Sequence, residues 1–151
     1  MPLTILVVPA FSALCNLAFA LRREVFVLEQ KVPESLENDE DDLSATHLVA
    51  VVEGEVVGTL RLIEKPEHVK IGRVAVRHSY RGRGIARELM GWAMDHSRAQ
   101  GNDKFFLTAQ ADKLGMYEKL GFTAFGPEFM DAGMPHRAMR TYDQQSAELT
   151  N

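Results

Sequence analysis

The chain has 151 residues, of which 46% are hydrophobic and 25% are charged, and its formal net charge is −4. This length and composition fit one soluble globular domain over 1–151 with its own hydrophobic core. The acidic balance disfavours nucleic acid as the main partner, because nucleic-acid-binding surfaces are usually rich in Lys and Arg. A single cysteine, Cys15, excludes an internal disulfide. No apolar stretch reaches the about 20 residues of a membrane span, so we expect a cytoplasmic protein with no membrane partner.

Hydrophobic periodicity predicts the elements of the first half of the chain. A short apolar run over 3–9 indicates a strand, and apolar residues at helical spacing indicate a helix from about 12 to 29. The next segment, 34–42, carries six acidic residues in nine positions, which is typical of a solvated loop or short helix. The stretch 47–64 contains two strand-like runs divided at Glu53-Gly54-Glu55, which predicts a hairpin.

The second half alternates between strands and helices. The predicted elements are a strand at 69–76, a helix at 83–100, a strand at 104–110, a short helix at 111–120, and two strands near 122–126 and 136–142. With the acidic segment counted as a short helix, the order is β-α-α-β-β-β-α-β-α-β-β. This order predicts an α/β fold with a mixed sheet, and residues 143–151 are expected to form a flexible tail.

Five arginines lie between positions 73 and 87, together with two glycines, in the stretch that joins strand 69–76 to the next helix. The first amides of a helix have no partner within it, and its dipole favours negative charge there. Gly82 and Gly84 free the backbone for close approach, and Arg81 and Arg83 are suited to oxygens of a phosphate. This turn therefore predicts a phosphate site, although a helix start with solvated arginines is the structural alternative.

The two standard nucleotide patterns do not fit this turn. The P-loop pattern requires a Lys followed by Ser or Thr, and the turn has neither after its glycines. The dinucleotide pattern requires a third glycine where this chain has Arg87, and no acidic residue ends the following strand. The phosphate is thus expected to belong to another class of ligand.

"RGRGIA" at 81–86, after a strand ending in "VAV", resembles the acyl-CoA-binding motif R/Q-x-x-G-x-G/A of the GNAT N-acetyltransferases. "MYEKLGF" at 116–122 resembles the "FYEKLGF" segment of the same superfamily. Further similarities to its ElaA-like branch are "REVFVLEQKVP" (23–33), "HLVA" (47–50), "GTLRL" (58–62), "AQ" (109–110) and "GMPH" (133–136). The resemblance spans roughly residues 20 to 140 and agrees with the predicted element order.

The resemblance implies the GNAT-like acyl-CoA N-acyltransferase fold and binding of acetyl-CoA as co-substrate. The pyrophosphate is then expected on the main-chain amides of residues 81–86, and the pantetheine arm beside the backbone of residues 74–76, between two splayed parallel strands. Gln110 stands near the place where many relatives use asparagine to hold the pantetheine. The expected cofactor-binding residues are Val74, Ala75, Val76, Arg81, Gly82, Arg83, Gly84, Ile85, Ala86 and Gln110.

The resemblance makes Tyr117 the candidate general acid for the leaving thiolate, whereas its helical spacing alone is also that of a core residue. The glutamate that many GNAT enzymes carry on the strand before the turn is replaced here by Gly72. Glu29 is the first choice as general base, because its region lines the acceptor side in related folds; the other candidates are Glu128, Asp131 and His136. Phe26, Gln30 and His136 are expected to contact the acceptor.

The leading hypothesis is an enzyme that transfers an acetyl group from acetyl-CoA to a primary amine of a small molecule by direct attack on the thioester. The alternative is a non-catalytic module that binds acyl-CoA or another phosphorylated ligand, and the absent strand glutamate favours it. A nucleic-acid-binding domain is the third and least favoured hypothesis. The histidines have no metal-ligand spacing, so no metal is expected. A homodimer through the last β segments is left open.

Overall fold

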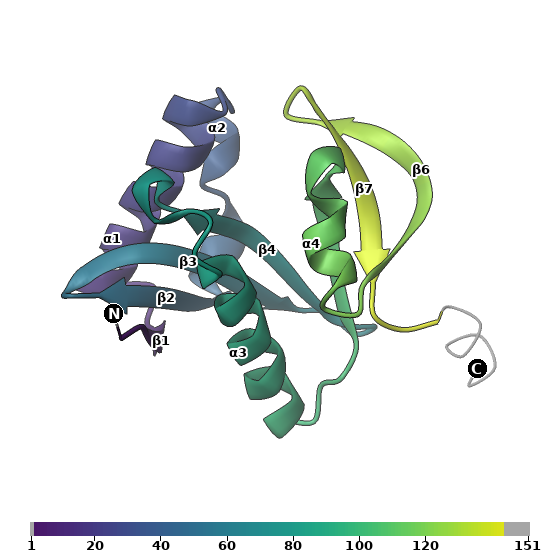
Figure 1. Cartoon of the computed structure of the whole chain (residues 1–151), viewed down its shortest axis with the longest axis horizontal. Coiled ribbons are helices and arrows are strands. Elements are labelled where there is room, and N and C mark those ends of the chain that lie inside the picture. Colours follow the sequence, from purple (N-terminus) through teal and green to yellow (C-terminus); the bar gives the residue numbers. More distant parts are fainter. Residues whose placement is uncertain (1, 144–151) are drawn as a thin grey trace.

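A seven-stranded mixed sheet carries the fold in the order β1-β2-β3-β4-β5-β7-β6. The computed structural model describes residues 2–143, so almost all of the expected tail lies outside the described residues. Figure 1 shows the two halves of the sheet diverging from each other. The strands are β1 (Thr4–Val8), β2 (Thr46–Val52), β3 (Glu55–Glu64), β4 (Val69–Val76), β5 (Phe105–Gln110), β6 (Thr123–Asp131) and β7 (Met134–Arg140).

The helices follow the predicted order, which confirms the expected fold class. They are α1 (Ala13–Arg22), α2 (Glu34–Glu37), α3 (Ile85–Ala99) and α4 (Leu114–Glu118). Short 3-10 turns are η2 (Glu40–Leu43), η3 (His78–Tyr80) and η4 (Ala111–Lys113). The predicted helix 12–29 is continuous but changes character, because its second half, η1 (Arg23–Glu29), is π-helical.

Helices cover both faces of the sheet. Ser12 caps α1, since its side chain accepts a hydrogen bond from the Cys15 N–H, and the buried side of α1 packs on β3. On the other face, α3 buries a stripe of apolar residues against β2, β3 and β4. The contact is close at Gly58, where an added Cβ would lie 2.9 Å from Leu89 Cδ1. This packing fixes the start of α3 relative to the end of β4.

Strands β4 and β5 are parallel but pair only at Val69–Phe105 and Lys70–Phe106. Beyond these two positions β5 continues along β7, and β4 continues along β3. A bulge in β4 accompanies this divergence, and Arg73 has a left-handed φ of 50° there. The main chain of β4 from residue 71 onward therefore has no strand partner among the described residues on its β5 side.

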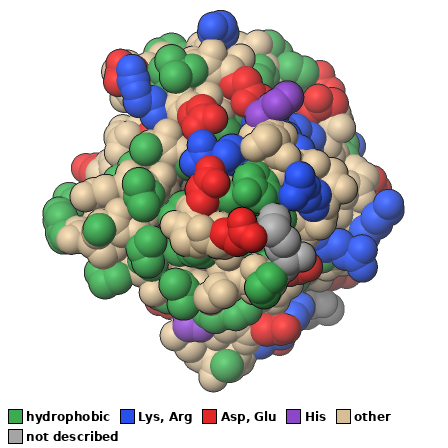
Figure 2. All heavy atoms as spheres, turned by 60° about the vertical axis from the view of Figure 1, so that its left-hand side comes forward, with side chains coloured by type: hydrophobic (Ala, Val, Ile, Leu, Met, Phe, Trp, Pro, Cys, Tyr) green, Lys and Arg blue, Asp and Glu red, His purple; other side chains and the backbone are tan. Residues whose placement is uncertain are grey.

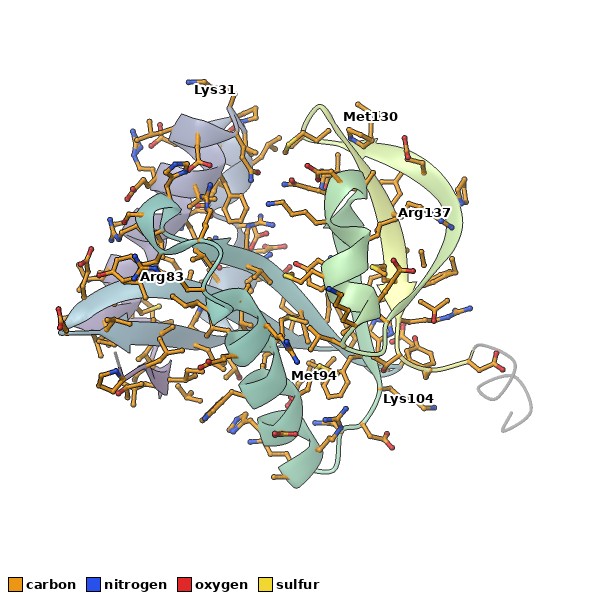
Figure 3. All side chains as sticks on the ribbon, viewed as in Figure 1. Lys31, Arg83, Met94, Lys104, Met130 and Arg137 are labelled. Carbon is orange, nitrogen blue, oxygen red and sulfur yellow. The ribbon has the colours of Figure 1, made fainter. Side chains whose placement is uncertain are left out.

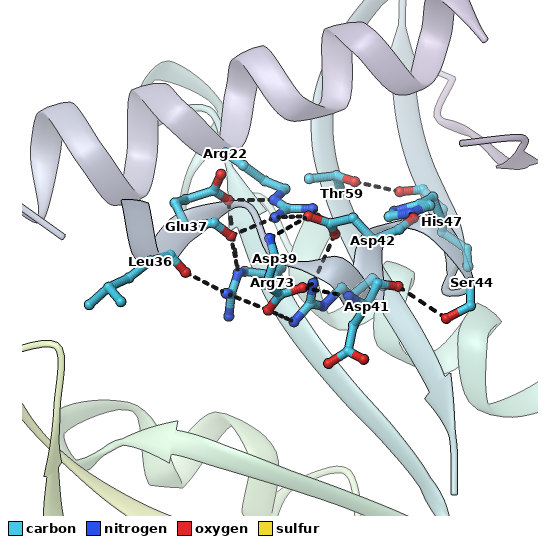
Figure 4. Close-up of polar contacts among 12 residues, drawn as sticks. Arg22, Leu36, Glu37, Asp39, Asp41, Asp42, Ser44, His47, Thr59 and Arg73 are labelled. Atoms are coloured by element: carbon cyan, nitrogen blue, oxygen red, sulfur yellow. Dashed lines mark hydrogen bonds and ion pairs between the residues drawn. The ribbon is translucent and has the colours of Figure 1, made fainter. Parts of the chain in front are cut away.

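The acidic segment 34–42 begins with a short helix, α2, and most of its residues are exposed, as expected, but two of its carboxylates are not solvated. The side chains of Glu37 and Asp42 are buried, and both bind Arg22, with Arg22 Nε 2.5 Å from Glu37 Oε1 and Arg22 Nη1 2.8 Å from Asp42 Oδ1. Arg61 Nη1 lies 2.7 Å from Asp39 Oδ1 and 2.8 Å from Asp42 Oδ1. Figure 4 shows how these groups join α1, α2 and the sheet. Buried carboxylates are stable only when paired, and these arginines supply the partners.

Candidate active site

A cleft of about 440 Å³ lies where β4 and β5 diverge. Its floor is formed by the unpaired edges of these strands, and its walls come from η1 and α2 on one side and from α4 and the β6–β7 hairpin on the other. In Figure 3, Lys31 beside η1 and Met130 in the hairpin stand on opposite sides of this region. The divergence of the sheet thus creates the space that a ligand can enter.

The turn between β4 and α3 presents a run of free main-chain donors. Among the described residues, nothing accepts a hydrogen bond from the N–H groups of 82–87, whereas the Arg81 N–H binds the His78 carbonyl. Gly82 and Gly84 have φ values of 77° and 79°, and an added Cβ at either would meet no atom within 4 Å. The glycines therefore allow the left-handed turn rather than avoid a clash. Several amides at one helix start form an anion site.

The Arg81 side chain is engaged in an ion pair with Glu29. Arg81 Nη1 lies 2.6 Å from Glu29 Oε2, and Arg81 Nη2 lies 2.9 Å from Glu29 Oε1. This hydrogen bonding, with the charge of Arg81, lowers the pKa of Glu29 below its ordinary value. A lower pKa makes the carboxylate a weaker base. Arg83 is exposed at the start of α3, with its guanidinium 4.9 Å from the centre of the Tyr80 ring (Figure 3).

Tyr117 lines the cleft from α4 and is only 8% exposed. Its ring contacts Phe122 edge-on, with centroids 6.2 Å apart, which fixes the side chain in the core beneath the cleft. Burial raises the pKa of Tyr117 to about 12. The phenol is therefore protonated at every pH at which the protein would be assayed, as a proton donor must be.

Gln30 and Gln110 meet across the cleft, although they are eighty positions apart. Gln110 Nε2 donates to Gln30 Oε1 at 2.9 Å and joins the end of η1 to the end of β5. Both residues line the cleft, and so does Phe26. This bond spans the divergence between the two halves of the sheet, so a ligand that enters here must pass beside it or replace it.

The β6–β7 hairpin forms the opposite wall. His136 is 8% exposed and lines the cleft, with Nδ1 2.8 Å from the Met134 carbonyl oxygen. Phe129 lies across from it in the strand register and stacks on its ring. Asp131 and Met134 also pair across the hairpin, and both line the cleft. Asp131, one of the candidate bases, is thus brought to the cleft together with His136.

The cleft also contains charged residues whose role the sequence analysis did not recognise. Arg61, Arg73 and Glu37 reach its lining from the buried network, and Lys70 does so from β4. Arg61 stands within an otherwise apolar, buried strand, and this is the sequence feature that would have identified it. The carboxylates that bind Arg61 and Arg73 are 19 to 34 positions away along the chain, so no local pattern connects them.

The structure brings together ten of the fifteen residues expected at the site. Those that line the cleft are Val74, Ala75, Val76, Arg81, Ala86, Gln110, Tyr117, Phe26, Gln30 and His136. The others are Glu29, Gly82, Arg83, Gly84 and Ile85. Gly82, Arg83 and Gly84 form the exposed turn, the Ile85 side chain belongs to the core, and Glu29 lies beside Arg81.

Within the described part of the chain, no group of three or more His, Cys, Asp or Glu side chains is arranged to hold a metal ion. None of the described helices is long and apolar enough to cross a membrane. On the face shown in Figure 2, Lys and Arg side chains lie among Asp and Glu side chains and do not form one continuous basic patch. The free amides of the turn therefore remain the candidate anion site beside the cleft.

Comparison with known proteins gives a consistent result. The model of the acetyltransferase (GNAT) domain family matches residues 10–142. An uncharacterized N-acetyltransferase, YjcF, of Bacillus subtilis is 36% identical over 124 residues, which cover 81% of this chain and 88% of the relative. The crystal structure of an acyl-CoA N-acyltransferase from Pseudomonas aeruginosa is 30% identical, covers 93% of this chain and 100% of that chain, and superposes with a TM-score of 0.84.

Escherichia coli ElaA is 27% identical to this chain, with a TM-score of 0.83, and the match covers 93% of this chain and 100% of ElaA. The family match includes β4, the turn and α4, which are the elements that build the cleft. Fold, sequence and site geometry agree, and the chain belongs to the GNAT acetyltransferase family and is an acyltransferase.

Proposed function

We propose that the protein transfers an acetyl group from acetyl-CoA to the primary amine of a small molecule. The observation that carries this proposal is the run of unpartnered amides at 82–87, directly beside the unpaired edge of β4. The amides and Arg83 are suited to a diphosphate. The backbone of Val74, Ala75 and Val76 is suited to an amide-rich arm that pairs like an added strand. Acetyl-CoA would supply an activated thioester to this site.

Tyr117 is proposed as the general acid that protonates the departing thiolate. A thiol in water has a pKa of about 8.5, whereas burial raises the pKa of the Tyr117 phenol to about 12. Proton transfer from Tyr117 to a thiolate with the lower pKa would therefore be uphill. The dry surroundings that raise the phenol pKa also raise that of a thiol, because burial disfavours both anions. The pKa values of the phenol and the thiol therefore differ less within the cleft than these two numbers do. The proton is present on Tyr117 throughout the pH range of an assay.

Several residues are candidates for the general base that accepts the proton of the amine. Gly72 offers no side chain, and the ion pair with Arg81 weakens Glu29 as a base. Glu29 stays a candidate, together with Asp131 and His136 in the cleft wall. Glu128 lies in β6 but is not among the lining residues. A basic lining also disfavours the ammonium form of an amine and so supplies part of what a base would provide.

The first test is titration calorimetry with acetyl-CoA. Saturable binding at micromolar concentration is expected, because several amides and a guanidinium would meet the diphosphate. No heat with a demonstrably folded protein at high micromolar acetyl-CoA would contradict the proposal. Release of free thiol with a panel of amines then tests the transfer itself, since a protein that only binds acyl-CoA would release none.

Tyr117→Phe tests the proposed acid. Thiol release is expected to fall about 100-fold, at the lower end of the range for general acid catalysis, while the Kd for acetyl-CoA stays within twofold. Tyr142→Phe is the matched control, because the Tyr142 hydroxyl binds His68 at 2.6 Å and Tyr142 does not line the cleft. Unchanged turnover in Tyr117→Phe would remove the phenol from the mechanism.

A further inference from the structure

The end of the cleft away from the turn has a basic floor. Arg61, Lys70 and Arg73 line it from β3 and β4, and the acidic residues in the lining are Glu37 and Asp131. Glu37 is fully buried and held by Arg22, with Arg22 Nε 2.5 Å from Glu37 Oε1. Asp131 stands on the opposite wall, in the hairpin. Asp39 and Asp42, whose carboxylates balance Arg61 and Arg73, are not among the lining residues, so the β4 side of this end presents guanidinium and ammonium groups to the cleft.

Arg61 has a buried donor that no protein group satisfies. Its side chain is 5% exposed, and both of its Nη atoms bind carboxylates of Asp39 and Asp42. Its Nε is buried without a hydrogen-bond partner among the described residues. Buried polar atoms in native proteins nearly always have a partner, so this N–H beside the cleft lacks a partner that a water or a ligand atom would supply.

The space next to Arg61 is open. Gly72 pairs directly with Arg61 across β3 and β4 and lines the cleft. An added Cβ at Gly72 would meet no atom within 4 Å. Most side chains at this position would occupy that space, and a glutamate would place a carboxylate there. The glycine leaves this part of the cleft, across from the backbone of Arg61, unfilled.

Arg73, the next residue, adds a second donor. Its Nε binds the Glu37 carbonyl at 3.1 Å, and its Nη2 binds the Leu36 carbonyl at 3.2 Å and Asp39 Oδ2 at 3.3 Å. No described residue accepts from its Nη1, and the side chain is 28% exposed. Burial, with the neighbouring charges of Arg61 and Arg22, lowers the pKa of Arg73, although Asp39 and Glu37 act in the opposite direction. Its Nη1 is therefore the donor that a ligand could use.

We propose that Arg61, Gly72 and Arg73 form a subsite for an oxyanion of the acceptor, so that the preferred substrate is an amine that also carries a carboxylate or phosphate. This inference rests on the proposed function and names its substrate class. Guanidinium groups match both oxyanions in geometry. The same positive wall favours the neutral form of the amine, which must attack without a glutamate at position 72.

Matched pairs of acceptors test the subsite in the thiol-release assay with the full chain. The pairs are L-phenylalanine with phenethylamine, and O-phosphoethanolamine with ethanolamine. A kcat/KM at least tenfold higher for the anionic member of either pair is expected, and the two pairs separate carboxylate from phosphate. Equal use of neutral and anionic members would overturn the inference while leaving the proposed acetyl transfer in place.

Binding of products tests the subsite without turnover. Calorimetry in the presence of CoA compares N-acetyl-L-phenylalanine with N-acetylphenethylamine, and N-acetyl-O-phosphoethanolamine with N-acetylethanolamine. At least tenfold tighter binding of an anionic product is expected even if no amine in the panel is acetylated, a result that would count against the proposed function alone. If no anionic product binds more tightly than its neutral counterpart, the subsite does not exist.

Two variants locate the effect. Arg73→Gln is expected to lower the ratio of kcat/KM for the preferred anionic acceptor to kcat/KM for its neutral counterpart at least tenfold. Gly72→Glu, which keeps Arg73 and its contacts with α2, is expected to remove the preference for the anionic acceptor. Arg98→Gln, on the outer surface of α3, is the control. Equal losses for the anionic and the neutral acceptor in both subsite variants, with the fold shown to be intact by circular dichroism, would contradict the inference.

Discussion

Two groups of arginines in this protein differ in their exposure to water. The inner arginines are Arg22, Arg61 and Arg73, and the turn arginines are Arg81 and Arg83. The inner group is held by carboxylates and carbonyls of the segment 36–42, largely out of water. The turn group stands at the surface. A buried guanidinium must have its partners built into the fold, whereas an exposed one is free to exchange them for a ligand. The inner group therefore contributes mainly to stability, with Arg61 and Arg73 also proposed to contact the acceptor, whereas the turn group is suited to binding the co-substrate.

The largest expected effect is the loss of an inner arginine. Arg22→Met leaves the buried carboxylates of Glu37 and Asp42 without their main partner, and the free energy of unfolding is expected to fall by about 3–5 kcal/mol. Arg83→Met, in the turn, is expected to change it by less than about 0.5 kcal/mol. Urea unfolding of both variants measures the difference. Similar losses in the two would abolish the distinction between the groups.

The inner group also predicts a response to acid. Burial alone would raise the pKa of Asp42, but Arg22 and Arg61 outweigh it and bring the pKa to about 2. A carboxyl whose pKa is lower in the folded state stabilises the fold above its ordinary pKa of 3.8, and this stabilisation is lost as the pH falls through about 2. The shift corresponds to about 2 kcal/mol.

Urea unfolding between pH 6 and pH 2 checks this prediction. The wild-type free energy of unfolding is expected to fall more steeply below pH 4 than that of Asp42→Asn. Asp112→Asn, an exposed position in η4, is the control and should follow the wild type. Parallel curves for wild type and Asp42→Asn would show that Asp42 does not carry the acid sensitivity.

The turn group predicts an effect on binding. Gly84→Ala forces a residue with a Cβ to hold a φ of 79°, which costs about 1–2 kcal/mol or distorts the turn. We expect the affinity for acetyl-CoA to fall about tenfold, measured by calorimetry. Gly91→Ala, within α3 of the same protein, should stabilise the helix by about 1 kcal/mol and leave the affinity unchanged. Unchanged affinity in Gly84→Ala would separate the turn from acetyl-CoA binding.

The smallest expected change tests the ion pair between the turn and η1. Exposed ion pairs contribute about 0.2–1 kcal/mol, so Glu29→Gln should release Arg81 and tighten acetyl-CoA binding by up to about fivefold. If Glu29 is instead the general base, thiol release falls by about 100-fold or more at saturating acetyl-CoA. Steady-state kinetics with calorimetry distinguish the two roles, and Glu34→Gln, also in an exposed ion pair, is the control.

Local patterns predicted most of the fold and the turn. Strand 69–76 was predicted with its observed bounds, and the helix after the turn to within two residues, because period-two and helical patterns are strong there. The hairpin at Glu53-Gly54 follows from the break between two strand-like runs, and both residues have positive φ, which glycine adopts readily and glutamate rarely does. The resemblance added Tyr117 and Gln110, which lie in the cleft, although their roles stay proposals.

Long-range pairing could not be predicted in this way. Glu37 and Asp42 of the acidic segment are buried because arginines from α1, β3 and β4 converge on this segment, whereas composition alone favours solvated carboxylates. The bond between Gln30 and Gln110 depends on how two distant elements meet. The π-helical turns of η1 have no distinctive sequence pattern. The ion pair between Glu29 and Arg81 therefore could not be predicted from the sequence.

The sparse pairing between β4 and β5 has a consequence for the lifetime of the protein. Two register pairs join the half-sheets directly, so a ligand that lies between them completes the sheet and adds its binding energy to the fold. A ligand at a free concentration of 100 times its Kd would raise the free energy of unfolding by about 2.7 kcal/mol. If acetyl-CoA occupies the cleft as proposed, resistance to heat and proteolysis should therefore follow the supply of acetyl-CoA, so that starvation for the co-substrate would also shorten the survival of the enzyme.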